Sequence, residues 1–192
     1  MSNSIQYRHA TPANFPGILA LQTQNLRKNL DDVQQRQGFL SVEYGAPDLA
    51  TINDELGIYV AVENNQLLAY AMAETNEFAG QVPVIAHMAS RFPGTKFDGQ
   101  PIASLRYFIY GPVCIDRAAR GRGLLTGLLQ DMSRALSAHF DLGIAFISQI
   151  NIHSFHAHVH KNRMTVIDEF EFDGRKFWTV AFRLTDYLQK NT

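Results

Sequence analysis

Tyr107–Leu129, YFIYGPVCIDRAARGRGLLTGLL, joins an aromatic, β-branched run to a leucine-rich segment through a short polar loop. The first part predicts a buried strand within Ser104–Ile115. The second part predicts a helix, because its apolar residues recur at helical spacing on one face: Leu125, Leu128, Leu129, Met132 and Leu136. A strand that turns through glycines into a helix is a common frame for an anion-binding site.

The turn itself is Arg120-Gly121-Arg122-Gly123. Glycine has no Cβ, so backbone N–H groups in this turn can approach an anion closely. The first helical turn adds unpaired donors and the positive end of the helix dipole, and two arginines add charge. A diphosphate fits these features, whereas the alternative is a plain glycine turn into a core helix. The chain lacks the Gly-Lys-Ser/Thr of a nucleotide P-loop and a GxGxxG with a ribose-binding acid.

This strand–RGRG–helix unit resembles the acetyl-CoA signature of the GNAT superfamily of N-acyltransferases. In that family the pattern is Arg or Gln, two residues, Gly, one residue, then Gly or Ala. Arg120 and Gly123 match the first and fourth positions, and Leu125 occupies the last, where Gly127 nearby is expected to give slack. The resemblance spans Ile5 to Leu184. It implies acetyl-CoA as cosubstrate, bound by Arg120, Gly121, Arg122, Gly123, Leu124, Leu125 and Thr126.

Gly111-Pro112 interrupts the strand before the turn. Proline cannot donate to a strand ladder, so a bulge or splay is expected there, the alternative being a kink that only bends the sheet. The resemblance implies that the pantetheine arm pairs with this splayed strand, at the backbone of Val113, Cys114 and Ile115. Cys114 is not expected to be a nucleophile, because buried single cysteines usually behave as small hydrophobes.

The remaining segments predict one domain over residues 1–192, an α/β (α+β) fold with a mixed, mostly antiparallel sheet, a central splay and flanking helices. A helix is expected from Thr11-Pro12 to about Leu30. Two hairpins are expected, turning at Asn64-Asn65 and Asp173-Gly174. The expected elements are a strand at Ser4–His9, strands Gly57–Glu63 and Gln66–Glu74, a short helix Val82–Phe92, strand Gly143–Ile150, helix Ile152–Lys161, and strands Thr165–Phe172 and Lys176–Leu184.

The segment Asn151–Met164 holds four histidines. Asn151, Ser154 and His158 are spaced by three and four, so they share one helical face. The resemblance implies that Asn151 and Ser154 contact CoA or the splay, and His158 stands where the family has a tyrosine. A thiolate leaving group benefits from a proton donor, so His158 is predicted as general acid or thiolate hydrogen-bond donor, with a structural histidine as the alternative.

His153, His156 and His160 form a second histidine face, and residues three or four apart on a helix can bind one zinc ion together. No further Cys or acidic ligand stands at helical spacing beside these residues, so no metal is predicted.

An attacking amine must lose a proton, and Glu74 at the end of its strand is the predicted general base, with Glu77 and His87 as rivals. The alternative for Glu74 is an exposed strand-end carboxylate. The irregular segment 75–103 is expected to form the acceptor site or an interface, so a homodimer is possible. It includes the apolar residues Phe78, Val82, Val84, Ile85, Met88 and Phe92.

Composition narrows the functional class. Lys and Arg number 17 against 18 Asp and Glu, for a net charge of −1, which disfavours a nucleic-acid partner. No apolar run approaches the roughly 20 residues of a membrane span, and the N-terminus lacks a signal-peptide pattern. With a single cysteine, the cytoplasm is the expected compartment.

Together these features predict an N-acetyltransferase that moves an acetyl group from acetyl-CoA to a small-molecule or peptide amine by direct attack in a ternary complex. One alternative is an acyl-CoA sensor or scaffold without turnover. Another is an assembly domain whose glycine turn is incidental.

Overall fold

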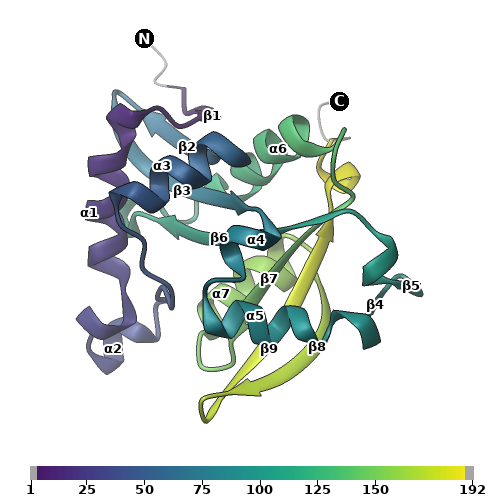
Figure 1. Ribbon diagram of the computed structural model, residues 1–192. Coiled ribbons are helices and arrows are strands. Elements are labelled where there is room, and N and C mark those ends of the chain that lie inside the picture. Colours follow the sequence, from purple (N-terminus) through teal and green to yellow (C-terminus); the bar gives the residue numbers. More distant parts are fainter. Residues whose placement is uncertain (1–3, 189–192) are drawn as a thin grey trace.

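The computed structural model describes residues 4–188, which form a seven-stranded sheet flanked by helices (Figure 1). The strand order is β1-β2-β3-β6-β7-β9-β8, and β6–β7 is the parallel pair among otherwise antiparallel neighbours. The strands are β1 Gln6–His9, β2 Ile58–Glu63, β3 Gln66–Glu74, β6 Tyr107–Ile115, β7 Leu142–Ser148, β8 Thr165–Phe172 and β9 Arg175–Arg183, with a separate small hairpin of β4 Lys96–Phe97 and β5 Gln100–Pro101. The predicted mixed, mostly antiparallel α/β domain is confirmed.

Helices cover both faces of the sheet (Figure 1). They are α1 Phe15–Asn25, α2 Asp32–Gln35, α3 Ala46–Glu55, α4 Asn76–Ala79, α5 Pro83–Ser90, α6 Leu124–Leu136 and α7 Ile152–Phe155, the last continued by a π-helical turn at His156–Lys161. The leucine face of α6 packs across one side of the sheet. On the other side, α1 and α3 pack over the β1–β3 half and α5 over the β7–β9 half. Among residues 4–188, no helix has both the length and the apolar character needed to cross a bilayer.

The centre of the sheet is splayed, as predicted. β6 and β7 pair over Tyr107, Phe108 and Ile109 only, and from Tyr110 onward β6 pairs with β3 alone within the sheet. The register between β3 and β6 shifts at Gly111-Pro112, where Gly111 has a φ of 112°. The strand therefore bulges where the proline cannot donate to a ladder, and it separates from β7 beyond that point.

The two predicted hairpin turns are confirmed. Asn64 and Asn65 both adopt positive φ, at 51° and 64°, which is the backbone conformation of a type I′ turn. Asp173 and Gly174 do the same, at 52° and 66°. The first turn fixes the register of β2 with β3, so it determines which side chains of β3 face the groove described below, and the second fixes the register of β8 with β9.

Two local predictions differ from the structure. The helix expected to reach Leu30 ends at Asn25, because Leu26 is extended and forms a β-bridge with Leu40. Helix α3 was not predicted, although its buried Leu49 and Ile52 are spaced by three.

The helix predicted at Val82–Phe92 is confirmed as α5, and the rest of the segment 75–103, expected to be irregular, contains α4 and the β4–β5 hairpin. Its Ile85, Met88 and Phe92 are buried against β7, β8 and β9, so these side chains belong to the core of the chain. They do not form the exposed apolar surface that an interface would need.

Candidate active site

A groove passes through the sheet where β6 and β7 diverge. It consists of two neighbouring cavities, both partly open to solvent, with about 650 and 510 Å³ of empty space when the open solvent at their mouths is included. We call the first the Glu74 cavity and the second the Arg120 cavity, after a residue that lines each one. The two cavities share Phe39, Leu40, Val113, Asn151, Ser154 and His158. Residues that are far apart in the sequence therefore line one continuous passage.

The start of α6 is open at one end of this groove. Gly121 and Gly123 have φ values of 80° and 76°, a region that favours glycine. No side chain caps the helix at Gly123, and a Cβ built at either glycine would meet no atom within 4 Å. The free N–H groups of the first turn of α6 are therefore accessible, and the turn fits a phosphate group.

The two arginines of the turn are held by neighbouring segments. Arg120 donates from Nη1 to the Gln37 carbonyl oxygen at 2.6 Å, and from Nε to the Ile115 carbonyl at 3.5 Å. Arg122 forms a bidentate ion pair with Glu63, with N···O distances of 2.6 and 3.1 Å. Their charges lie beside the turn, so the backbone N–H groups are its free donors.

The residues that follow the turn explain how α6 is seated. Leu125 is buried with the leucine face of α6 and also lines the Arg120 cavity. Thr126 donates from Oγ1 to Asn162 Oδ1 at 2.8 Å. At Gly127, where slack for a phosphate was expected, a Cβ would lie 2.2 Å from the ring of Tyr7. Gly127 is needed for packing against β1.

Asn151, Ser154 and His158 lie together on one side of the segment after β7, as their spacing predicted. Asn151 begins α7 by accepting the Ser154 N–H at Oδ1, over 3.2 Å, and donates from Nδ2 to the Phe39 carbonyl at 2.9 Å. His158 lies one turn beyond Ser154. Its Nδ1 is 2.8 Å from the Ser154 carbonyl oxygen and 3.2 Å from Ser154 Oγ, and its Nε2 is 3.3 Å from Tyr110 Oη.

His158 is buried, and burial lowers its pKa to about 4. The imidazole is therefore neutral at neutral pH. A lone pair on Nδ1 would repel the Ser154 carbonyl at 2.8 Å, so Nδ1 carries the proton and Nε2 accepts from the Tyr110 hydroxyl. The resting form is not the imidazolium that a general acid requires, and the proton-donor role of His158 stays a prediction.

Glu74 faces the groove from the end of β3. It is only 1% exposed, so the alternative of an exposed strand-end carboxylate is wrong. Tyr44 Oη donates to Glu74 Oε2 at 2.9 Å, and Oε1 has no hydrogen-bond partner among the described residues. Desolvation raises the pKa of Glu74 to about 8, although the Tyr44 hydrogen bond acts in the opposite direction.

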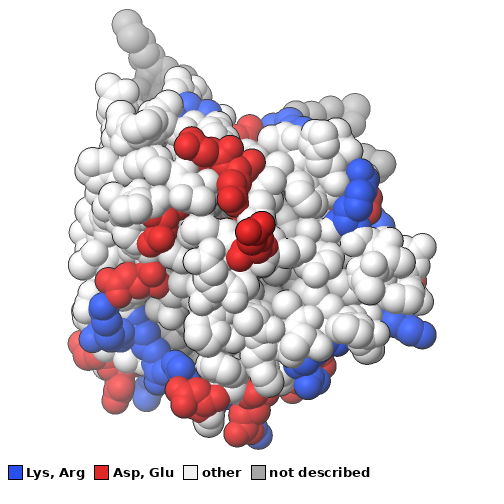
Figure 2. Space-filling model, in the orientation of Figure 1, with Lys and Arg blue, Asp and Glu red and all other residues white. Residues whose placement is uncertain are grey.

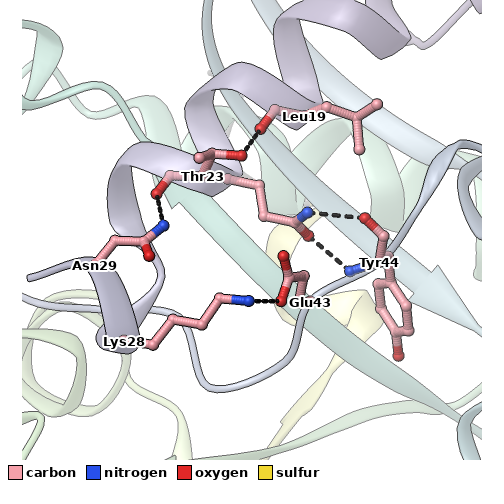
Figure 3. Close-up of polar contacts among 7 residues, drawn as sticks. Leu19, Thr23, Lys28, Asn29, Glu43 and Tyr44 are labelled. Carbon is pink, nitrogen blue, oxygen red and sulfur yellow. Dashed lines mark hydrogen bonds and ion pairs between the residues drawn. The ribbon is translucent and has the colours of Figure 1, made fainter.

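Tyr44 is itself fixed by α1. Gln22 donates from Nε2 to the Tyr44 carbonyl at 2.8 Å and accepts the Tyr44 N–H at 3.0 Å. Figure 3 shows these two contacts on the Tyr44 backbone and the neighbouring ion pair between Lys28 and Glu43. The segment from Phe39 to Tyr44 is thus anchored over the groove, and it aims the Tyr44 hydroxyl at Glu74.

Other candidates lie elsewhere. Glu77 is exposed on α4, and His87 packs against the rings of Phe170 and Phe172. Neither residue lines the Glu74 cavity. The Cys114 thiol is buried, with its pKa raised to about 12 mainly by desolvation, so it is not a thiolate nucleophile at neutral pH.

The three histidines of the second face do not lie together at one site. His153 lines the Arg120 cavity, whereas the rings of His156 and His160 lie 4.5 Å apart on the next turns. Within residues 4–188, no group of three His, Cys, Asp or Glu side chains is arranged to hold a metal ion.

Sequence reasoning missed Tyr44, Tyr110 and Phe39. Tyr44 and Tyr110 contact partners 30 and 48 residues away in the chain, so no local spacing could have indicated them. Phe39 enters the site through its backbone carbonyl, which carries no sequence signal.

Comparison with solved structures identifies the fold. An N-acetyltransferase from Staphylococcus aureus Mu50 aligns over 94% of this chain and 99% of its own, with a TM-score of 0.61 and 16% identity. A GNAT-family acetyltransferase from Streptococcus agalactiae aligns over 93% and 95%, with a TM-score of 0.62 and 18% identity. A Salmonella typhimurium protein assigned to the acetyltransferases, solved with acetyl-CoA, aligns over 99% of both chains, with a TM-score of 0.59 and 15% identity.

No protein-family model matches the chain, and no curated protein matches it in sequence. The chain therefore has the fold of the GNAT acetyltransferases, and this likeness is one of structure.

Proposed function

We propose that this chain is an N-acetyltransferase that moves an acetyl group from acetyl-CoA to a primary amine by direct attack in a ternary complex. One observation carries the proposal. A single groove through the splayed sheet has Arg120 of the glycine turn at one end and a buried carboxyl group with an unpaired oxygen at the other. The fold, which is that of acetyltransferases, supports the same activity.

In this proposal the glycine turn binds the pyrophosphate. The donors would be the open backbone of Gly121 and Gly123 and the first N–H groups of Leu124, Leu125 and Thr126. Arg120 would add positive charge at one side, and Arg122 would do so by exchanging Glu63 for the pyrophosphate. The strand edge of β6 at Val113, Cys114 and Ile115, left unpaired by β7, would accept the pantetheine arm. Asn151 and Ser154 would line the opposite wall of the groove.

Acetyl-CoA supplies the activated thioester when it is bound. Glu74 would then act as general base. Its ionised form would take a proton from the acceptor amine at the unpaired Oε1, and Tyr44 would hold Oε2 in place. The raised pKa of Glu74 matches this role. With a pKa of about 8, a fraction of the Glu74 side chains is ionised near neutral pH, and the ionised form is basic enough to accept the amine proton.

Because a neutral imidazole that gave up its proton would become an imidazolate, His158 would donate a hydrogen bond to the departing thiolate, which would take its proton from water. The donor form needs the proton on Nε2, and the Ser154 hydroxyl, 3.2 Å from Nδ1, could then donate to the vacated nitrogen. The Ser154 hydroxyl would therefore support the donor tautomer, against the repulsion between its own carbonyl oxygen and a lone pair on Nδ1.

The test measures acetyl-CoA binding and thiol release with Gly123→Glu. The substitution introduces a side chain and a negative charge at the free donors, and it should abolish binding measured by calorimetry while the protein stays folded. Gly174→Glu is the matched control, because Gly174 also has a positive φ of 66° and no neighbour within 4 Å of a Cβ, but it lies in the β8–β9 turn. Equal affinity in the two variants would refute the phosphate site.

The alternative, an acyl-CoA sensor or scaffold, predicts tight acetyl-CoA binding with no thiol release across a panel of amines. An assembly domain whose glycine turn is incidental predicts no binding at all.

A further inference from the structure

We propose that the acceptor is an apolar primary amine that carries no carboxylate or other anionic group near its nitrogen. The proposal rests on the acetyltransferase function above, and it concerns which amines enter the Glu74 cavity.

The walls of that cavity offer no counter-charge for an anion. Among the described residues that line it, none is Lys or Arg, and its charged side chain is Glu74. Much of the rest is apolar, including Phe39, Val42, Ile85 and Phe146. His158 is held neutral by burial, so it supplies no cation either.

The cations of the groove lie in its other half. Arg120 lines the Arg120 cavity and not the Glu74 cavity, and its guanidinium already donates to the carbonyls of Gln37 and Ile115. An acceptor carboxylate beside Glu74 therefore has no guanidinium within the same cavity.

Charges near the cavity favour a cation instead. Asp48, at the start of α3, is close enough to raise the pKa values of both Glu74 and Tyr44. Figure 2 shows acidic side chains over the α3 and α4 region of the visible face, whereas the basic ones lie toward its periphery. Such a field attracts an ammonium group and repels an anion.

The cost of placing a carboxylate in this cavity follows from its desolvation. An anion taken out of water without a partner is strongly disfavoured, and Glu74, once ionised, adds repulsion of like charge. Binding of an amine is favoured instead, because the unpaired Oε1 of Glu74 can accept a hydrogen bond from its N–H group. The cavity thus selects by charge, in addition to size and shape.

Three matched acceptors test this selection: phenethylamine, L-phenylalaninamide and L-phenylalanine. The amide and the acid have nearly the same shape and differ in charge. With thiol release as the readout at pH 8, we expect kcat/KM for phenethylamine and for the amide to exceed that for phenylalanine by at least about 100-fold. If phenylalanine reacts within tenfold of its amide, or the amide is as poor as the acid, the charge-based selection is overturned.

If none of the three reacts, calorimetry in the presence of CoA measures their binding, and equal or absent binding also overturns the proposal. Acetyl-CoA binding is measured separately with the same protein. Its absence refutes the proposed function, whereas normal acetyl-CoA binding without amine preference refutes only the acceptor class.

A charge added to the cavity wall provides the second arm. Val42→Arg should reduce the preference for the amide over the acid by at least about tenfold, because the guanidinium would pair with the carboxylate. Val33→Arg makes the same change on α2, where the side chain is 68% exposed and does not line the cavity, and should leave the preference unchanged. An unaltered preference in folded Val42→Arg would count against selection by charge.

Discussion

Replacement of Glu74 by Gln isolates the cost of keeping a carboxyl group in the groove. Burial raises the pKa of Glu74 from an ordinary 4.5 to about 8. At about 1.36 kcal/mol per pH unit, that separation is worth ~5 kcal/mol between the protonated and ionised forms. The folded protein keeps the proton between pH 4.5 and about 8, whereas the unfolded chain releases it. The Glu74 contribution to stability is therefore intact below pH 4.5 and is lost as the pH rises to about 8.

Glu74→Gln removes this dependence, because the amide stays neutral and still offers an oxygen to the Tyr44 hydroxyl. The free energy of unfolding of the variant, relative to wild type, should increase by ~4 kcal/mol between pH 5 and pH 8. Urea denaturation at matched ionic strength over pH 5–9 measures the difference. The same substitution should lower kcat by roughly 100-fold or more, since the base is gone.

Glu77→Gln is the matched control for this experiment. It makes the same replacement three residues further along, at an exposed position on α4 where no burial disfavours the ionised form, so the pH-dependent change in stability should be absent. If the difference between Glu74→Gln and wild type is constant over the range, the Glu74 carboxyl is not held protonated by burial, and the reasoning fails.

Three further predictions follow from neighbouring contacts. Ser154→Ala should lower kcat several-fold with little change in acetyl-CoA affinity, because the donor tautomer of His158 loses its hydroxyl partner; an unchanged kcat would exclude that tautomer. The free energy of unfolding of His158→Asn should rise relative to that of wild type as the pH falls from 6.5 to about 4, because the folded wild-type protein resists protonation of His158 in this range. Urea denaturation at pH 4.5 and at pH 7 measures the difference, and a difference that does not depend on pH would contradict the prediction. Gly127→Ala should cost about 1–3 kcal/mol of unfolding free energy by clashing with Tyr7, and Tyr7→Leu in the same chain should recover part of it; additive losses would argue against the clash.

The sequence was sufficient to predict the elements with strong local periodicity. β6 and α6 were identified because an aromatic, β-branched run and a leucine stripe have unambiguous periods. The face shared by Asn151, Ser154 and His158 followed from helical spacing alone and holds despite the π-helical turn. Helix α3 was missed, since it carries only a few apolar residues and begins beside Pro47.

What could not be predicted depends on packing between distant segments. Whether Glu74 is exposed or buried is decided by the segment from Phe39 to Tyr44, which crosses over the end of β3 and has no periodic pattern of its own. The protonation state of His158 depends likewise on its burial and on its contacts with Ser154 and Tyr110. Residue types indicated the candidates, and tertiary contacts fix their chemistry.

The separation of β6 from β7 also affects how the protein avoids self-association. Unpaired strand backbone usually lies at the outer margin of a sheet, where it can template pairing with another chain. Here such a margin lies inside the molecule, along the second half of β6. The segment around Phe39, tethered by Asn151 and Arg120, lines the passage beside it. We expect that loss of those tethers would expose this unpaired backbone to pairing with another chain.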